Sequence, residues 1–246
     1  MSLPIPATLI EHLQKARHAV VVTGAGISAE SGIPTFRDAQ SGLWAQFRPE
    51  ELASEKGFRA DPERVWQWYA WRRQQVLQIQ PNPGHHALAH LQQRLPRLTL
   101  ITQNVDGLHQ AAGSSDVIEL HGSIHRVRCL DRDCGEMDWP ADTSMVPKHA
   151  CGSLLRPAVV WFGEYLPEQA LTEAIAAVGH CDLLFSIGTS SMVYPAAELP
   201  VMAKRNGAVV VEINPNPTPL SQLADYVLTG EAGMVLPEIL KALEGK

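Results

Sequence analysis

The chain has 246 residues, 45% of them hydrophobic, so it can bury a sizeable core as one large domain or as a large domain with a small insert. Its formal net charge of −6 argues against general binding to nucleic acid or to an anionic membrane, since both call for a basic face. Four cysteines do not suggest a disulfide framework, and the first residues show neither the basic start nor the apolar stretch of a signal peptide, so we expect a cytoplasmic protein that spans no membrane.

Short apolar runs rich in β-branched residues recur along the chain and predict strands. Most of them lack strict alternation of polar and apolar residues, which is typical of strands covered on both faces. Helical stretches such as 85–95 and 167–179 lie between them. This order predicts an α/β fold with a Rossmann-like, doubly wound parallel sheet. The predicted strands are 19–24, 98–102, 117–122, 182–190, 208–214 and 226–230.

Each predicted strand ends in a polar or glycine-rich sequence. The carboxyl ends of parallel strands share one edge of the sheet, where ligands bind. Turn chemistry alone can produce any one of these endings, but together they favour a large polar ligand. The endings are 23–26, 103–106, 121–122, 188–190, 214–216 and 230–233.

The turn after the first predicted strand matches G-x-G-x-x-[GA] at Gly24, Gly26 and Ala29. This pattern after a strand is typical of the phosphate cradle of dinucleotide-binding folds. A hydride-transferring dehydrogenase would usually place an acidic residue ~20 positions later, at the end of a second strand. Glu50 and Glu51 do not lie at a strand end, so the turn favours a dinucleotide but not simple hydride chemistry.

Two stretches, 34–80 and 124–158, fall outside the alternation of strands and helices. The first contains a helix start, with Asp61 as the N-cap and Pro62 in the first turn. We interpret both as a smaller helical and zinc-ribbon-like domain, separated from the sheet domain by a cleft. The Rossmann-like domain would then comprise 1–33, 81–123 and 159–246.

Three cysteines lie in the second stretch, and their spacing suggests part of a zinc ribbon. Cys129 and Cys134 form C-x4-C, and Cys151 follows after sixteen residues, but position 148, where a second pair needs cysteine, is lysine. Zinc could be held by three thiolates with His149 or a carboxylate. Alternatively, packing alone holds a degenerate ribbon. The fourth cysteine, Cys181, is expected to be a small buried residue at a strand start.

Motifs along nearly the whole chain, from about Ala19 to Ala232, resemble those of sirtuins, which are NAD-dependent protein lysine deacylases. They occur in the family order: GAGISAESGIPTFRD, TQNVDGLH, ELHG, LLRPAVVWFGE, SIGTS and EINPN. The resemblance implies that NAD is consumed, with the acyl group passing from lysine to ADP-ribose and nicotinamide released. It also implies that any zinc is structural. The expected partners are NAD and acyl-lysine proteins or peptides.

The resemblance assigns most of the polar endings to NAD. Asp106 would accept a hydrogen bond from the carboxamide of nicotinamide, as suits an ionised carboxylate. Taken without the resemblance, Phe36 and Arg37 are a core and a surface residue, and Asn104 could cap a helix. The other matching residues are Gly24, Ala25, Gly26 and Ile27 on the pyrophosphate and nicotinamide side, Phe36 and Arg37 in the cofactor loop, Gln103, Asn104 and Val105 at the nicotinamide ribose, and Gly188, Thr189, Ser190, Asn214, Pro215, Asn216 and Ala232 on the adenosine side.

The resemblance implies that His121 is the general base and that Asn104 is a second catalytic residue. An imidazole that titrates near ~6.5 suits removal of a ribose hydroxyl proton at neutral pH. A lone histidine at a strand end can also be purely structural.

The bulky segment VVWFGE is predicted to be extended and could be an ordinary buried strand. The resemblance makes it the edge on which a substrate peptide pairs, with the acyl-lysine in an apolar tunnel. The residues concerned are Val160, Trp161, Phe162 and Gly163.

Tyr69 and Arg72 share one face of the helix that follows Asp61. An amphipathic helix with inward aromatics and solvated arginines would explain them. Tyr-x-x-Arg also matches the motif of class III sirtuins, which remove succinyl and malonyl groups, with acetyl also accepted. A guanidinium fork and a phenol would pair with the acyl carboxylate.

Other functions fit the sequence less well. An NAD-linked oxidoreductase lacks its ribose acid here, and a non-catalytic NAD-sensing module would not need His121, Asn104 and Asp106 together. A zinc-ribbon reader of nucleic acid conflicts with the acidic balance.

Overall fold

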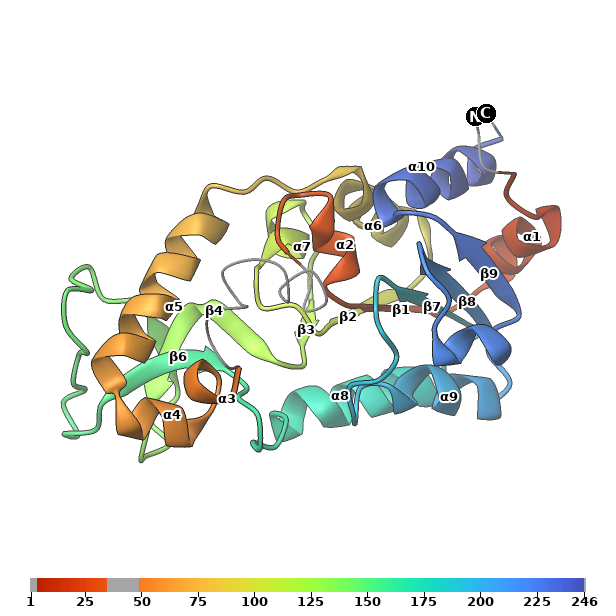
Figure 1. Cartoon of the computed structure of the whole chain (residues 1–246). Coiled ribbons are helices and arrows are strands. Elements are labelled where there is room, and N and C mark those ends of the chain that lie inside the picture. Colours follow the sequence, from red (N-terminus) through yellow and green to blue (C-terminus); the bar gives the residue numbers. More distant parts are fainter. Residues whose placement is uncertain (1–3, 35–48, 246) are drawn as a thin grey trace.

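A computed structural model of the chain describes residues 4–34 and 49–245. Within them lies a six-stranded sheet with the order β3-β2-β1-β7-β8-β9, parallel throughout (Figure 1). The order reverses between β1 and β7, as in Rossmann folds. This confirms the predicted fold class, and all the predicted strands lie in the sheet. They are β1 (Ala19–Thr23), β2 (Leu98–Thr102), β3 (Ile118–Glu119), β7 (Leu183–Ile187), β8 (Val209–Asn214) and β9 (Tyr226–Thr229).

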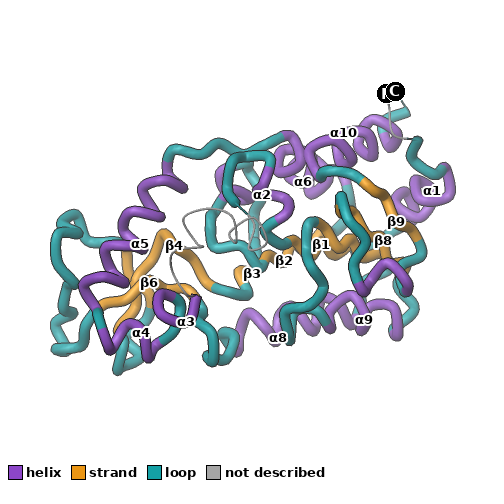
Figure 2. Tube along the Cα trace, in the orientation of Figure 1, coloured by secondary structure: helices purple, strands orange, loops and turns teal. Residues whose placement is uncertain are grey.

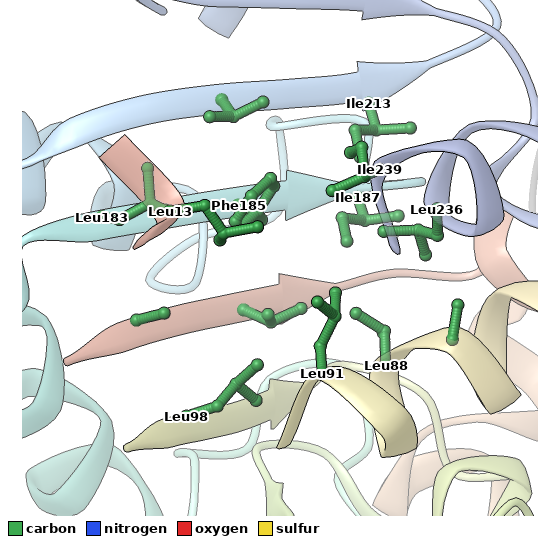
Figure 3. Packing of buried hydrophobic residues seen from close by; sticks show 14 of the residues in the cluster. Leu13, Leu88, Leu91, Leu98, Leu183, Phe185, Ile187, Ile213, Leu236 and Ile239 are labelled. Atoms are coloured by element: carbon green, nitrogen blue, oxygen red, sulfur yellow. The ribbon is translucent and has the colours of Figure 1, made fainter. Parts of the chain in front are cut away.

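Helices cover both faces of this sheet (Figure 1). One face packs against α1 (Ala7–Lys15), α6 (Pro83–Arg94) and α10 (Ala232–Leu243), and Figure 3 shows Leu88, Leu91, Leu236 and Ile239 of α6 and α10 on this face. The other face packs against α8 (Glu168–Gly179) and α9 (Glu198–Arg205).

The strands bury both of their faces, as their apolar runs predict. In β1, Val21 belongs to the core under α1, α6 and α10, whereas Val20 and Val22 belong to the core over α8 and α9. In β7, Phe185 and Leu184 divide in the same way. Each buried aliphatic side chain contributes about 1.5–3 kcal/mol relative to exposure, so these strands fix the sheet firmly.

A separate core lies beside a three-stranded antiparallel sheet of order β5-β4-β6. Its buried residues come from 52–76 and 124–161, and Figure 2 shows these elements at the end of the molecule away from α1 and α10. The domain boundaries given above stay a prediction. The elements are α3 (Pro49–Leu52), α4 (Glu55–Ala60), α5 (Pro62–Leu77), β4 (Gly122–Cys129), β5 (Glu136–Asp138) and β6 (Leu155–Val159).

Helix α5 starts where the sequence predicts. The Asp61 side chain accepts a hydrogen bond from the backbone N–H of Arg64 at 3.1 Å, and Pro62 occupies the first position of the helix. Short helices α2 (Gly26–Ala29) and α7 (Leu108–Ala111) follow β1 and β2, and the 3-10 turn Pro219–Gln222 follows β8. Among the described residues, no helix combines the length and apolar character needed to cross a membrane.

The loops after β1 and β7 touch backbone to backbone. Gly26 N–H donates to Gly188 O at 2.8 Å. A Cβ added to Gly24 would lie 2.9 Å from Gly188 O, and one added to Gly26 would lie 2.7 Å from Gly188 Cα. Gly188 itself has φ +60°. The small residues of this turn therefore serve contact between two loops, whatever ligand they also hold.

Replacing Gly26 with alanine should lower the free energy of unfolding by about 1–3 kcal/mol, because the new methyl group meets backbone that cannot turn aside. Urea unfolding measures this. Gly179→Ala is the matched control, because Gly179 ends α8 with open space around it and should change stability by less than about 1 kcal/mol. Equal destabilisation by both changes would contradict the close-contact explanation.

Candidate active site

The predicted strand endings gather at one edge of the main sheet. Gly24 N–H donates to Ile187 O at 3.0 Å, Gln103 N–H to Thr23 O at 2.9 Å, and Gly188 N–H to Ile213 O at 2.9 Å. The loops that follow β1, β2, β7 and β8 are thus joined in the order of the strands. Phe36 and Arg37 lie outside the described residues.

A buried polar network links the first turn to the loop after β2. Asn104 donates from Nδ2 to Gly24 O and to Ser28 Oγ, both at 3.1 Å. Ser28 Oγ donates to Asp106 Oδ2 at 2.8 Å. Asn104 does not cap a helix: α7 begins later, and Asp106 Oδ1 accepts from Leu108 N–H at 3.0 Å. This network holds Asn104 and Asp106 beside the glycine-rich turn.

Asp106 is 7% exposed, and burial raises the pKa of its carboxyl, while the hydrogen bonds from Leu108 N–H and Ser28 act against that rise. Each carboxylate oxygen has a further lone pair, so an ionised Asp106 can accept another hydrogen bond. This arrangement suits a ligand that offers an N–H.

Two histidines that the sequence interpretation missed lie behind this network. His85 Nε2 lies 3.5 Å from Ser28 Oγ, His109 Nε2 lies 2.9 Å from Thr23 Oγ1, and the two rings are 4.9 Å apart. Burial lowers the pKa of His85 to about 4 and that of His109 to about 3, so both are neutral at pH 7. His109 is the last residue of the motif TQNVDGLH, and His85 lies in the first turn of α6, but neither follows a predicted strand directly, so the rule about strand endings does not assign them a role.

His121 follows β3, and its tautomer is fixed by the backbone. Its Nδ1 lies 2.9 Å from Gln103 O, and because a carbonyl only accepts, Nδ1 carries the hydrogen. Nε2 of the neutral ring is then the basic atom. Burial lowers the pKa of His121, opposed by the bond to Gln103, so the neutral form prevails at pH 7.

The residues expected on the adenosine side frame the loop after β7. Asn214 Nδ2 donates to Thr189 O at 2.7 Å, and Thr189 Oγ1 accepts from Ser191 N–H at 2.9 Å. Pro215 and Asn216 are exposed beside Asn214. Ala232 is buried at the start of α10. Gly188 and Ser190, in the loop after β7, are half-buried at the same edge of the sheet.

The expectation of an extended segment at 159–164 holds only as far as Val159, where β6 ends. Val160 N–H donates to His121 O at 2.9 Å, which attaches this segment to the histidine. Beyond it the chain turns, with Glu164 N–H donating to Trp161 O at 3.0 Å and Gly163 at φ +88°. Phe162 is 56% exposed, whereas Trp161 is 2% exposed and lies in the separate core.

Tyr69 and Arg72 on α5 reach this same region. Tyr69 is 2% exposed, and Trp161 Nε1 donates to its hydroxyl oxygen at 2.9 Å. Arg72 lies with its Cζ 5.4 Å from the Trp68 ring centroid. Burial lowers the pKa of Arg72, and the nearby Tyr69 and Asp106 act against that change.

The structure brings Cys129, Cys134, Cys151 and His149 together, with one ligand atom of each within 4.8 Å of all the others. Cys151 Sγ lies 3.7 Å from the sulfurs of both other cysteines. Thiolates about 2.3 Å from a tetrahedral zinc lie about 3.8 Å apart, so the set fits zinc. Such an ion would join the end of β4, which carries Cys129, to Cys134 in the following loop and to His149 and Cys151 in the segment before β6. Cys181 is buried elsewhere, as expected.

The comparisons with known proteins agree on one family. The family model described as "Sir2 family" matches residues 24–195. An NAD-dependent protein deacylase of Methylococcus capsulatus is 52% identical, with 96% of each chain covered. NAD-dependent protein deacylase 1 of Pseudomonas aeruginosa is 51% identical, over 95% of this chain and 97% of the relative.

Solved structures give the same answer. A crystal structure of a Sir2 homologue in complex with NAD is 46% identical and has a TM-score of 0.93, and the match covers 99% of this chain and 96% of its own. A Sir2 protein bound to a myristoylated histone peptide is 40% identical, with a TM-score of 0.78 over 97% of this chain and 95% of its own.

Protein purified without added zinc should contain about one zinc ion per chain, because the four ligands are placed for tetrahedral coordination. Cys151→Ser should abolish the zinc content and lower the thermal midpoint. Elemental analysis and thermal unfolding measure the two effects. Cys181→Ala is the matched control and should keep the zinc. Zinc-free protein with an unchanged midpoint would contradict the assignment.

Proposed function

This chain belongs to the Sir2 family, and we propose that it is an NAD-dependent protein lysine deacylase that favours succinyl and malonyl groups and also accepts acetyl. Its products are the free lysine, nicotinamide and O-acyl-ADP-ribose. The deacylase activity rests on curated relatives of that name at about 50% identity over nearly the full length. The acyl preference rests on one observation: Tyr69 is hydrogen-bonded to Trp161 of the substrate segment, and Arg72 lies one turn further along the same helix, near Tyr69 and Asp106.

The NAD site would use the edge where β1 and β7 diverge. When bound, NAD supplies an electrophilic ribose carbon that loses nicotinamide and receives the acyl oxygen. Asp106 would accept from the carboxamide N–H, and its buried carboxylate is already oriented by Ser28 and Leu108. Asn104, fixed by Gly24 and Ser28, would orient the adjoining ribose.

His121 would act as the base. Gln103 O holds the Nδ1 hydrogen, so Nε2 takes the proton from a ribose hydroxyl without a change of tautomer. The bond from Val160 N–H to His121 O ties the substrate segment to the same residue.

The acyl end would be recognised by charge. A succinyl or malonyl carboxylate taken out of water needs a partner, because leaving it unpaired costs several kcal/mol. The Arg72 guanidinium offers two parallel N–H donors to such a carboxylate. Burial raises the pKa of Tyr69, so its phenol stays protonated at neutral pH and can donate one more hydrogen bond.

We expect the enzyme to act in the cytoplasm on acyl-lysine proteins, without nucleic acid or membrane as a partner. The four unpaired cysteines and the net charge of −6 support this expectation.

Arg72→Met should lower kcat/KM for a succinyl-lysine peptide about 100-fold more than for the matching acetyl-lysine peptide, because only the former loses a charge-assisted pair. Incubation of each peptide with NAD, followed by mass analysis of products, measures both rates. Equal losses of kcat/KM on both peptides would refute the recognition of the acyl carboxylate by Arg72.

The reaction type is tested with the same incubations. Release of nicotinamide without formation of NADH would separate deacylation from oxidoreductase chemistry.

The acidic limb of the pH–rate profile should have its midpoint below ~6.5, the ordinary histidine value, because burial lowers the pKa of His121 and activity is lost only when the ring becomes protonated. Initial rates of deacylation, measured from about pH 4.5 to about pH 8, give this midpoint. His121→Ala should abolish turnover, whereas the exposed His90→Ala should keep the wild-type profile. Turnover by His121→Ala at a near-normal rate would remove the role.

A further inference from the structure

The Glu164 carboxylate collects hydrogen bonds from three different parts of the chain. Its Oε2 accepts from Trp161 N–H at 2.9 Å and from Arg128 at 3.0 Å. Both of its oxygens also accept from the Arg156 guanidinium, whose side chain is only 3% exposed. Glu164 therefore closes the turn that carries Trp161 and neutralises a buried cation beneath it.

Arg156 and Trp161 are in direct contact. The Arg156 Cζ lies 3.3 Å from the centroid of the Trp161 ring, and Arg156 also donates to Val159 O at 2.7 Å. Phe58 packs against the same indole, with ring centroids 5.4 Å apart. The indole is thus held on its face and at its backbone, so its Nε1–H has a fixed direction.

That N–H meets the oxygen of Tyr69. An indole N–H can only donate, so the Tyr69 oxygen is the acceptor of this bond. Among the residues that the structure describes, no acceptor is recorded for the Tyr69 hydroxyl hydrogen. With one side of the phenol oxygen taken by Trp161, the hydrogen is directed to the other side.

We propose that Glu164 and Arg156 are positioning residues for acyl selectivity: they hold Trp161 so that its N–H occupies the Tyr69 oxygen and leaves the phenol hydrogen for the acyl carboxylate. The inference rests on the proposed preference for acidic acyl groups. It assigns to the Arg-Pro-Ala-Val-Val-Trp-Phe-Gly-Glu segment a role at the acyl end of the substrate, in addition to pairing with the peptide.

Trp161→Phe tests the proposal, because it keeps an aromatic ring and removes only the donor and part of the ring. The ratio of kcat/KM for succinyl to acetyl peptide should fall about tenfold, mainly through a higher KM for the succinyl peptide. Trp66→Phe is the matched control: it removes the same groups from the same core, where Trp66 Nε1 donates to Thr143 O, and should leave the ratio unchanged. Equal changes in both variants would overturn the proposal.

A double-mutant cycle makes the test specific to one hydroxyl. If Trp161 acts through Tyr69, the variant with both Trp161→Phe and Tyr69→Phe should have the selectivity of Tyr69→Phe alone. Losses that multiply would overturn the proposal. Glu164→Gln should also lower the ratio, whereas Arg128→Gln, which removes a bond to Glu164 from a half-exposed side chain, should change it by less than about twofold.

The acyl preference and the positioning role of Glu164 and Arg156 can be refuted separately. If Arg72→Met lowers the ratio and Trp161→Phe does not, the positioning role is refuted and the acyl preference survives. If wild-type enzyme turns over succinyl and acetyl peptides equally and Arg72→Met does not alter the ratio, both are refuted.

Discussion

The site depends on the direct contact between the backbones after β1 and β7. Gly26 and Gly188 can form their 2.8 Å hydrogen bond only because neither carries a Cβ. This contact lies where the strand order reverses, so it sets the edge from which the neighbouring loops extend. Asn104 is attached to Gly24, and the backbone of Gln103 is attached to Thr23. Since Gln103 O in turn fixes the ring of His121, the position of the base follows from the same contact.

Much of the main sheet could be predicted from the sequence, because strands buried on both faces appear as continuous apolar runs. β1 and β7 are fully buried along their length, and both were recognised in this way. The strands β4, β5 and β6 were not recognised. β4 contains Arg126 and Arg128, whose charges are compensated by partners distant in sequence, such as Glu136 and Glu164, and this compensation is not visible in a local pattern.

The candidate site was predictable where residues follow strands and not where side chains meet across the fold. Asn104, Asp106 and His121 end predicted strands, so a rule about strand endings finds them. The bond between Tyr69 and Trp161 joins residues 92 positions apart, and Ser28, His85 and His109 are buried behind the edge. Buried polar groups of this kind are recognised only once their partners are known, because burial without a partner is costly.

Helix α5 supplies Tyr69 and Arg72 from outside the main sheet, and its start is fixed by its own cap at Asp61. The groups that would read the acyl chain and those that would hold the dinucleotide therefore stand on different secondary-structure elements. Substitutions on one face of this helix can alter which modified lysine is chosen while the glycine contact and the histidine stay as they are. The architecture leaves substrate choice open to evolutionary change at little risk to the shared chemistry.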